Sequence, residues 1–259
     1  MNKTKIFHDL HHGARPLVLP NAWDFGSAAI LAAEGFPAIG TTSLGVAVAA
    51  GLPDGTGVTA EATLALARLL ARLPVPVTVD IEGGFSESPS AVAEYVAQLA
   101  ELGIAGVNLE DGRAESALAE PDHQSEVIAA IKARSPELFV NARVDTYWLK
   151  LDTDTTQSRA EQYTAAGADG IFVPGLTDPD EIGRIVAATP LPLNILYAPT
   201  GPSLTALADL GVRRVSTGSL LYRTALAAAV AAARAVRDDT PTPTAAPSYR
   251  RIQALTDPA

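Results

Sequence analysis

The stretch AELGIAGVNLE, residues 100–110, contains the transition that decides the fold. An Ala- and Leu-rich segment ends at Gly103, and the β-type run GVNLE (106–110) follows it. Glycine is the usual residue just after a helix, because it adopts the left-handed backbone conformation at little cost. The same order of helix, glycine and strand recurs in AAEGFPAIG (32–40), TAAGADGIF (164–172) and ADLGVRRVS (208–216). These repeats predict a fold in which helices and strands alternate.

Strand and helix segments alternate along the whole chain. The β-type runs are PLVLP (16–20), AIGTTS (38–43), PVTVD (76–80), GVNLE (106–110), LFVNAR (138–143), GIFVP (170–174), PLNILY (192–197) and RRVSTG (213–218). Helices are expected at 24–34, 59–72, 89–102, 122–134, 155–166, 178–188, 201–209 and 219–236. Eight strand–helix units predict a (β/α)8 TIM barrel, a single-domain α/β fold of about this length.

A doubly wound open sheet is the main alternative to the barrel. Such a sheet normally has fewer strands and a glycine-rich nucleotide-binding turn. The chain contains neither a G-x-G-x-x-G nor a G-x-x-x-x-G-K-[ST] motif, which favours the barrel. We expect a catalytic barrel over residues 1–237. Residues 238–259 are rich in Pro and Thr and are expected to form an extended C-terminal arm or a partly disordered end.

Composition narrows the partners and the compartment. The net charge is −10, from 19 basic and 29 acidic residues, and no basic cluster is present, so we expect no nucleic-acid partner. No apolar run is long enough to span a membrane, and no apolar segment follows the N-terminal lysines as in a secretory signal. We therefore expect a cytoplasmic protein without a membrane partner. Cysteine is absent, which excludes disulfides and catalysis by a thiol.

Polar side chains concentrate at the ends of the predicted strands, where TIM barrels place their active sites. In VTVDIEGGF (77–85), Asp80 and Glu82 are two residues apart, and residues two apart in a strand share a face. Asn108 and Glu110 have the same spacing on the next strand. Further polar residues in these positions are Thr41, Thr42, Ser43, Asp54, Asp111, Asn141, Arg143, Asp145, Asn194, Ser216 and Thr217.

Carboxylates on consecutive strands predict a metal site. Several acids in one small volume raise one another's pKa and destabilise the fold unless a cation neutralises them. Oxygen ligands without cysteine suit a hard ion, Mg²⁺ or Mn²⁺. Alternatively, single acids cap helices or form surface ion pairs. Their occurrence on three consecutive strands, together with Arg143, favours the shared site.

Lysine and histidine are less informative. None of Lys3, Lys5, Lys132 and Lys150 falls at a strand end, which disfavours a Schiff-base mechanism. His123 begins a predicted helix and is expected at the surface. The other histidines, His8, His11 and His12, lie in a helix-like N-terminal segment and are expected to be structural or exposed.

Six motifs, in order and at this spacing, resemble the isocitrate lyase/phosphoenolpyruvate mutase superfamily over nearly the whole chain. They are LPNAWDFGSA (19–28), GTTSLGVAVAAGLPDG (40–55), VDIEGGF (79–85), GVNLEDG (106–112), NARVDT (141–146) and GADGIFVPG (167–175). The resemblance implies a (β/α)8 barrel that makes or breaks C–C or P–C bonds of 2-oxo acids with Mg²⁺. It also implies a homo-oligomer, a tetramer or dimer, whose last helix is exchanged between subunits. The Ala-rich helix 219–236 suits this exchange, although it could instead cover its own barrel.

The resemblance implies a role for each acid at the metal. Asp80 resembles the family's direct metal ligand. Glu82, Glu110 and Asp54 resemble the acids that hold the ion's waters. The family more often has Asp at the position of Glu82.

The resemblance also implies how the substrate is bound. Ser43, with the backbone amides of Leu44 and Gly45, resembles the cradle for the substrate's carboxylate and oxo oxygens. Arg143 resembles the arginine that binds the oxo-acid end. We therefore expect Arg143, Glu110 and Ser43 to be catalytic. The expected substrate contacts are Ser43, Leu44, Gly45, Asp80, Asn108 and Arg143.

Two departures from the family pattern shape the functional prediction. The lyase branch has a Lys-Lys-Cys-Gly-His loop where this chain has RAESALAEPDHQSE (113–126), and the mutase branch has a histidine where this chain has Pro174. The enolate-stabilising half of the site remains. It predicts a Mg²⁺-dependent lyase or decarboxylase of a small 2-oxo (di)carboxylate such as oxaloacetate, acting through an enolate.

Two alternatives stay open. One is a 2-methylisocitrate lyase-like enzyme or a phosphonomutase whose proton donor is His123, Glu115 or Tyr147. The other is a non-catalytic barrel that binds a 2-oxo acid. The first predicts turnover of methylisocitrate or phosphonopyruvate, and the second predicts saturable binding without product.

Overall fold

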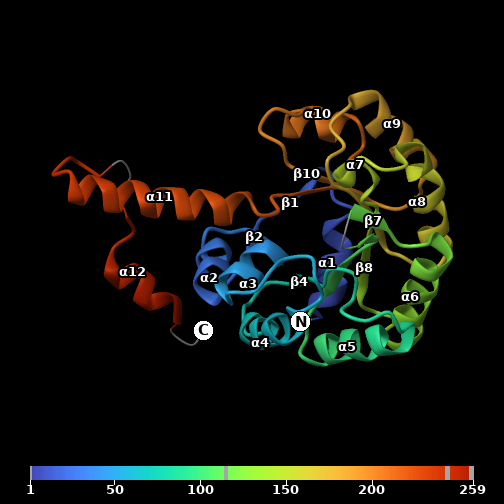
Figure 1. Ribbon diagram of the computed structural model, residues 1–259, viewed down its shortest axis with the longest axis horizontal. Helices are drawn as coiled ribbons and strands as arrows, with labels where there is room; N and C mark the ends of the chain where they lie inside the picture. Colours follow the sequence, from blue (N-terminus) through green and yellow to red (C-terminus); the bar gives the residue numbers. More distant parts are fainter. Residues whose placement is uncertain (1, 114–115, 243–245, 257–259) are drawn as a thin grey trace.

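The computed structural model describes residues 2–113, 116–242 and 246–256, which form a parallel β-barrel surrounded by helices (Figure 1). A nine-stranded sheet has the order β1-β11-β10-β9-β8-β5-β4-β3-β2. Its strands are β1 (Leu17–Leu19), β2 (Asn21–Ala22), β3 (Ile39–Thr41), β4 (Val77–Asp80), β5 (Gly106–Glu110), β8 (Phe139–Arg143), β9 (Gly170–Val173), β10 (Leu193–Leu196) and β11 (Arg214–Ser216). Every predicted strand run is present, and the predicted TIM barrel is confirmed.

The barrel closes through its first predicted strand, which Pro20 divides into β1 and β2. Proline has no N–H to donate to a ladder. On one side of it, Leu17 pairs in register with Arg214 of β11, and on the other, Asn21 pairs with Gly40 of β3. The two ends of the sheet order are therefore one continuous segment.

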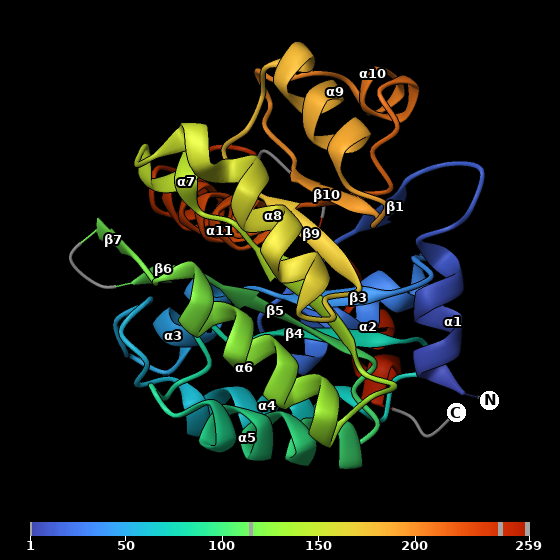
Figure 2. The same ribbon diagram turned by 90° about the vertical axis from the view of Figure 1, so that its right-hand side faces the viewer.

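Helices follow the strands, and all but the last of them cover the outside of the barrel. They are α2 (Phe25–Ala33), α4 (Ala60–Leu70), α5 (Pro89–Glu101), α6 (Pro121–Arg134), α8 (Thr156–Ala165), α9 (Pro179–Ala188), α10 (Leu204–Asp209) and α11 (Leu220–Arg237). Figure 2 shows α5, α6 and α8 on one side of the barrel, where α6 contacts both neighbours. The main core lies between this layer and the strands, and Val79, Val107 and Val140 are fully buried in it.

Several short elements are absent from the sequence-based prediction. They are α3 (Ser43–Ala49), α7 (Thr146–Leu149), α12 (Tyr249–Gln253), the 3-10 helices η2 (Thr153–Thr155) and η3 (Ala254–Thr256), and a hairpin of β6 (Gly112–Arg113) and β7 (Ala117–Leu118). The helix-like N-terminal segment is present as α1 (Lys3–Leu10). Helix α1 places Phe7 in the amino end of the barrel, in a small core with Phe139 and Leu19. A Cβ at Gly106 would lie 3.1 Å from the Phe7 ring, so glycine makes room for this plug.

Helix α11 extends away from the barrel, and the chain then returns toward α2 (Figure 1). Most side chains of α11 are exposed. Arg251 of α12 forms an ion pair with Glu34, and Leu255 packs on the main core. The prediction of an extended arm is therefore wrong for residues 249–256, which are helical. In the described part of the chain, no helix combines the length and apolar character needed to cross a bilayer.

Candidate active site

A cavity of about 250 Å³ lies at the carboxyl ends of the barrel strands. The predicted site residues in its lining are Ser43, Leu44, Asp54, Asp80, Asn108, Glu110 and Arg143. The structure thus brings together residues from five separate segments of the chain. Gly45 and Glu82 do not line this cavity.

Gly45 lies in the first turn of α3 and is buried. A Cβ at this position would lie 2.6 Å from Cβ of Trp23 and 2.8 Å from Cγ2 of Thr42. Glycine is therefore required here for close packing of α3 against Trp23. Its neighbours Ser43 and Leu44 line the cavity.

Glu82 has a different environment from Asp80. Strand β4 ends at Asp80, and Glu82 has a left-handed φ of +50°, so the alternation rule that predicted a shared face does not reach it. Its carboxylate accepts hydrogen bonds from the amide of Gly57, at 2.9 Å, and from the hydroxyl of Thr59. Glu82 lines a neighbouring cavity of about 310 Å³, which shares Glu110 with the first.

Asp80 is buried at the floor of the main cavity. Its Oδ2 lies 3.5 Å from Nδ2 of Asn108, and its backbone amide donates to Oγ1 of Thr41 at 2.9 Å. Burial raises the pKa of Asp80 to about 6, against the opposing charge of Arg143, and Asp54 raises it further. A positive charge in the cavity would stabilise the ionised form of Asp80.

Arg143 is surrounded by carboxylates. Its Nη1 lies 2.6 Å from Oε2 of Glu110, and its Nε lies 2.6 Å from Oδ1 of Asp145. Burial raises the pKa of Glu110 to about 8; Arg143 opposes this shift, whereas Asp145, Asp80 and Glu82 add to it. The negative charges of these carboxylates therefore exceed the one positive charge of Arg143.

These acids fit a magnesium ion that keeps most of its waters. In the described segments, no three His, Cys, Asp or Glu side chains are arranged as a ready metal cluster. Mg²⁺ usually takes only one or two carboxylates directly and retains several waters. Asp80, Asp54 and Glu110 line one cavity and offer only oxygen donors, which suits such a site.

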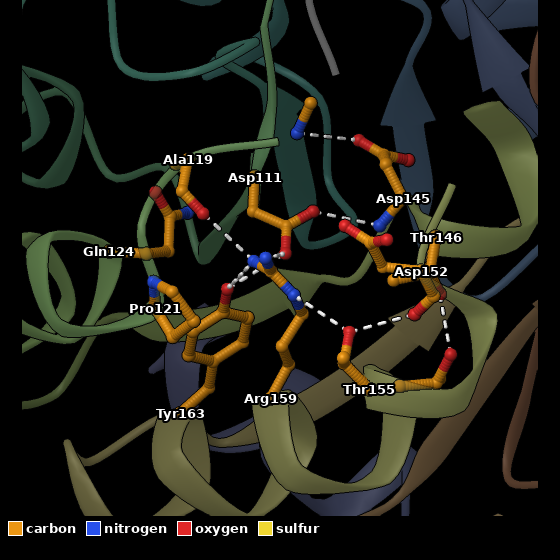
Figure 3. Close-up of polar contacts among 12 residues, drawn as sticks. Asp111, Ala119, Pro121, Gln124, Asp145, Thr146, Asp152, Thr155, Arg159 and Tyr163 are labelled. Carbon is orange, nitrogen blue, oxygen red and sulfur yellow. Dashed lines mark hydrogen bonds and ion pairs between the residues drawn. The ribbon is translucent and has the colours of Figure 1, made fainter. Parts of the chain in front are cut away.

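Behind Arg143 lies a buried network centred on Asp111. Figure 3 shows Asp111 between Asp145 and the side chains of Arg159 and Tyr163. Its Oδ1 accepts from the amide of Asp145 at 2.8 Å, and its Oδ2 accepts from Tyr163 Oη at 2.7 Å and from Arg159 Nη1 at 3.1 Å. Asp145 thereby connects helix α8 to the guanidinium in the cavity.

The network also anchors the loop that follows β5. Arg159 Nη1 donates to the carbonyl of Ala119 at 2.9 Å, and the amide of Gly112 donates to Asp145 Oδ2 at 3.1 Å. Both stems of the loop are therefore tied to the groups that hold Arg143.

Two of the three predicted proton donors, His123 and Tyr147, do not line the main cavity. Glu115 lies outside the described residues. His123 Nε2 lies 3.8 Å from Glu87, and Tyr147 donates to Glu181 at 3.2 Å. Neither His123 nor Tyr147 lines the cavity.

A polar layer inside the barrel consists of Asn108, Asn141, Asn194, Arg214 and Ser216, all buried. Asn108 and Ser216 also line the cavity. Arg214 is the member of this layer that was not predicted. Arg214 Nη2 donates to Asn108 Oδ1 at 3.0 Å, and Nε donates to Ser216 Oγ at 3.1 Å. Burial lowers the pKa of Arg214 to about 9. The available signal was the spacing of two between Arg214 and Ser216, which places both on the inner face of β11.

A second missed feature is an apolar wall in the lining of the cavity. It consists of Trp148, Leu149, Phe172, Pro174 and Leu196. Phe172 and Pro174 are two residues apart, so the spacing rule applied to the acids also identifies this face.

The family model described as phosphoenolpyruvate phosphomutase matches residues 7–237. An uncharacterized protein of Mycobacterium tuberculosis is 52% identical and covers 96% of this chain and 95% of its own. The 2-methylisocitrate lyase of Bacillus subtilis is 33% identical over 68% of this chain and 61% of its own, and the oxaloacetate decarboxylase of Ectopseudomonas mendocina is 32% identical over 69% and 64%. A solved phosphonopyruvate hydrolase complex with oxalate and Mg²⁺ has 25% identity and a TM-score of 0.86, covering 98% of this chain and 95% of its own.

Proposed function

The chain belongs to the phosphoenolpyruvate phosphomutase family, and on this premise we propose that it is a Mg²⁺-dependent lyase of a small 2-oxo acid. The bond broken joins the carbon next to the carbonyl, C3, to the carbon beyond it, C4. Oxaloacetate is the representative substrate, and it would lose C4 as CO₂ to give pyruvate. The observation that carries the proposal is Arg143 set among buried acids in a cavity at the strand ends. Similarity to an oxaloacetate decarboxylase and a 2-methylisocitrate lyase supports it.

Cleavage of this bond leaves an electron pair that must be stabilised as an enolate. A bound Mg²⁺ would supply electrostatic stabilisation of the enolate oxygen. Asp80 would hold the ion directly, and Asp54 and Glu110 would hold its waters. All three line the cavity. Burial raises the pKa of Asp80 and of Glu110, and a bound cation would favour the ionised form of both.

Arg143 would orient the substrate by charge-assisted hydrogen bonds to its oxo-acid end. Asp145 holds the guanidinium through Nε and Glu110 contacts its Nη1, and the side chain lines the cavity. Ser43 and the amides of Leu44 and Gly45 would bind the carboxylate. Decarboxylation needs no dedicated acid before bond cleavage, because the enolate can take its proton from water. This suits a cavity that neither His123 nor Tyr147 lines.

An NMR time course with oxaloacetate, 2-methylisocitrate, isocitrate and phosphonopyruvate, run with Mg²⁺ and again with EDTA, tests the proposal. We expect oxaloacetate to be lost faster than in the protein-free control, and only with Mg²⁺. Asp80→Asn should abolish this excess rate, whereas Asp209→Asn, at an exposed position, should not. Turnover of another compound in the mixture would identify that compound, and not oxaloacetate, as the substrate. Binding without product would identify a non-catalytic barrel.

We also propose that α11 joins subunits into a homo-oligomer. Leu226 and Val230 lie one turn apart on this helix and are 48% and 50% exposed. Light scattering should show a dimer or tetramer. The double variant Leu226→Glu, Val230→Glu should shift it toward monomer, because apolar helix surface of this extent is normally covered. A monomeric wild type would contradict the proposal.

A further inference from the structure

The two sides of the main cavity differ in chemistry. Ser43, Asp80, Glu110 and Arg143 form its polar side. The apolar wall described above comes from α7, β9 and β10 with the residues next to them and borders Arg143. A ligand that fills the cavity therefore needs a polar part and an apolar part.

The cations of the cavity lining already have polar partners. Arg113 and Arg143 are the basic residues in the described lining. Arg143 already contacts two carboxylates, and Arg113 donates to the carbonyl of Glu110 at 2.9 Å and to the side chain of Gln124 at 3.1 Å. A carboxylate held against the apolar wall would lose its water without gaining a charged partner, which is costly.

Two rings connect the apolar wall to the polar side. The guanidinium carbon of Arg143 lies 6.0 Å from the Trp148 ring centroid and 5.9 Å from that of Phe172. Phe172 is 5% exposed, but Trp148 is 54% exposed although it lines the cavity. A substrate anchored on Arg143 would therefore run directly along both rings, and Trp148 has free apolar surface to cover.

We infer that the natural substrate is a 2-oxo acid with an apolar substituent, alkyl or aryl, on the carbon next to the carbonyl. The substituent packs on the wall formed by Trp148, Phe172, Pro174 and Leu196. The inference rests on the proposed function for the position of the 2-oxo acid end. It distinguishes the natural substrate from oxaloacetate, which has hydrogen at the corresponding position.

Binding of product-like 2-oxo acids tests the inference without requiring turnover. Calorimetric titration of the wild type with Mg²⁺ would use oxalate, pyruvate, 2-oxobutanoate and 2-oxopentanoate. Each added methylene should tighten binding about fourfold, the effect of burying one CH₂ group. The matched comparison is 2-oxopentanoate against 2-oxoglutarate, which has the same chain with a carboxylate in place of the terminal methyl. We expect 2-oxopentanoate to bind at least tenfold more tightly.

A variant pair assigns the effect to the wall. Trp148→Ala should reduce the ratio of 2-oxopentanoate to pyruvate affinity toward one, each affinity being compared with that for oxalate in the same variant, since oxalate has no apolar part. Tyr197→Ala, at an aromatic residue that does not line the cavity, should leave this ratio unchanged.

The outcomes separate the two proposals. A wild type that binds neither oxalate nor any of these 2-oxo acids with Mg²⁺ would overturn the proposed function. A wild type that binds oxalate but gains nothing from the longer chains, or prefers 2-oxoglutarate, would overturn the inference alone.

Discussion

The mouth of the barrel and the polar layer inside the barrel each contain a buried arginine, but the two guanidiniums have opposite surroundings. Arg143, at the mouth, contacts Glu110 and Asp145 at 2.6 Å. Arg214, in the polar layer, donates to Asn108 and Ser216, which are uncharged. The neighbouring carboxylates raise the pKa of Arg143 despite its burial, whereas burial lowers that of Arg214. The mouth therefore pairs its arginine directly with carboxylates, whereas only the more distant charge of Asp80 offsets the burial of Arg214.

Removing the two charges should have opposite effects on stability. Arg143→Met leaves Glu110 and Asp145 without their cation and should lower the free energy of unfolding by about 3–5 kcal/mol, the usual result of breaking a buried pair. Arg214→Met removes a buried cation that has no carboxylate within ion-pair distance, so it relieves the desolvation cost of that charge and should be neutral or stabilising. Denaturant unfolding at pH 8 measures both.

Arg213→Met is the matched control for the second variant, because Arg213 is adjacent and exposed. It should leave stability unchanged. Equal losses from Arg143→Met and Arg214→Met would contradict the contrast between the two sites.

The Asp111 network tests how firmly the mouth is held. Tyr163→Phe deletes a 2.7 Å hydrogen bond to a buried carboxylate and should cost about 1.5–3 kcal/mol, the range for bonds to charged groups. Tyr95→Phe deletes a bond to the neutral carbonyl of Ala60 and should cost about 0.5–1.5 kcal/mol. If Asp111 positions Arg143 through Asp145, Tyr163→Phe should also weaken Mg²⁺-dependent oxalate binding several-fold. A loss of stability with unchanged oxalate affinity would limit the network to a structural role.

The lower part of the barrel has a pH dependence of its own through His11. Burial, reinforced by Arg214, lowers the pKa of His11 from 6.5 to about 3. Below pH 6.5 the unfolded chain therefore binds a proton that the folded chain does not, so stability falls as the pH drops toward 3. The slope from His11 is about 1.4 kcal/mol per pH unit.

The variant His11→Phe, which keeps a ring to stack on Phe139, should remove this part of the slope between pH 6 and pH 4.5. His12→Asn, at an exposed histidine, should retain it. Equal slopes in the wild type and His11→Phe would show that His11 does not carry the effect.

Local sequence signals predicted the barrel because each of them acts within a few residues. Four helix-ending glycines, Gly35, Gly103, Gly167 and Gly211, all have positive φ, as the helix–glycine–strand repeats require. Asp24 caps α2 through a 2.7 Å bond from the amide of Ser27. Helix α12 in the C-terminal arm was not predicted, because the Pro- and Thr-rich composition of this segment does not favour a helix. Its contact with the end of α2, from Arg251 to Glu34, joins residues far apart in sequence.

The site was predicted only in part because its key contacts join distant residues. Asn108 meets Arg214 across the barrel, 106 positions away in sequence. Asp111 reaches Tyr163 over 52 positions. The alternation rule placed Asp80 in the cavity but failed at Glu82, where the strand has already ended. The roles of these acids at a metal remain a prediction.

Calorimetric titration of oxalate, with Mg²⁺ and then with EDTA, tests the central claim most directly. The account predicts saturable binding with Mg²⁺, none with EDTA, none in Asp80→Asn even with Mg²⁺, and wild-type binding in Asp209→Asn. Oxalate binding of equal strength with and without the metal, or in Asp80→Asn, would contradict a magnesium-dependent 2-oxo acid site at the mouth of this barrel.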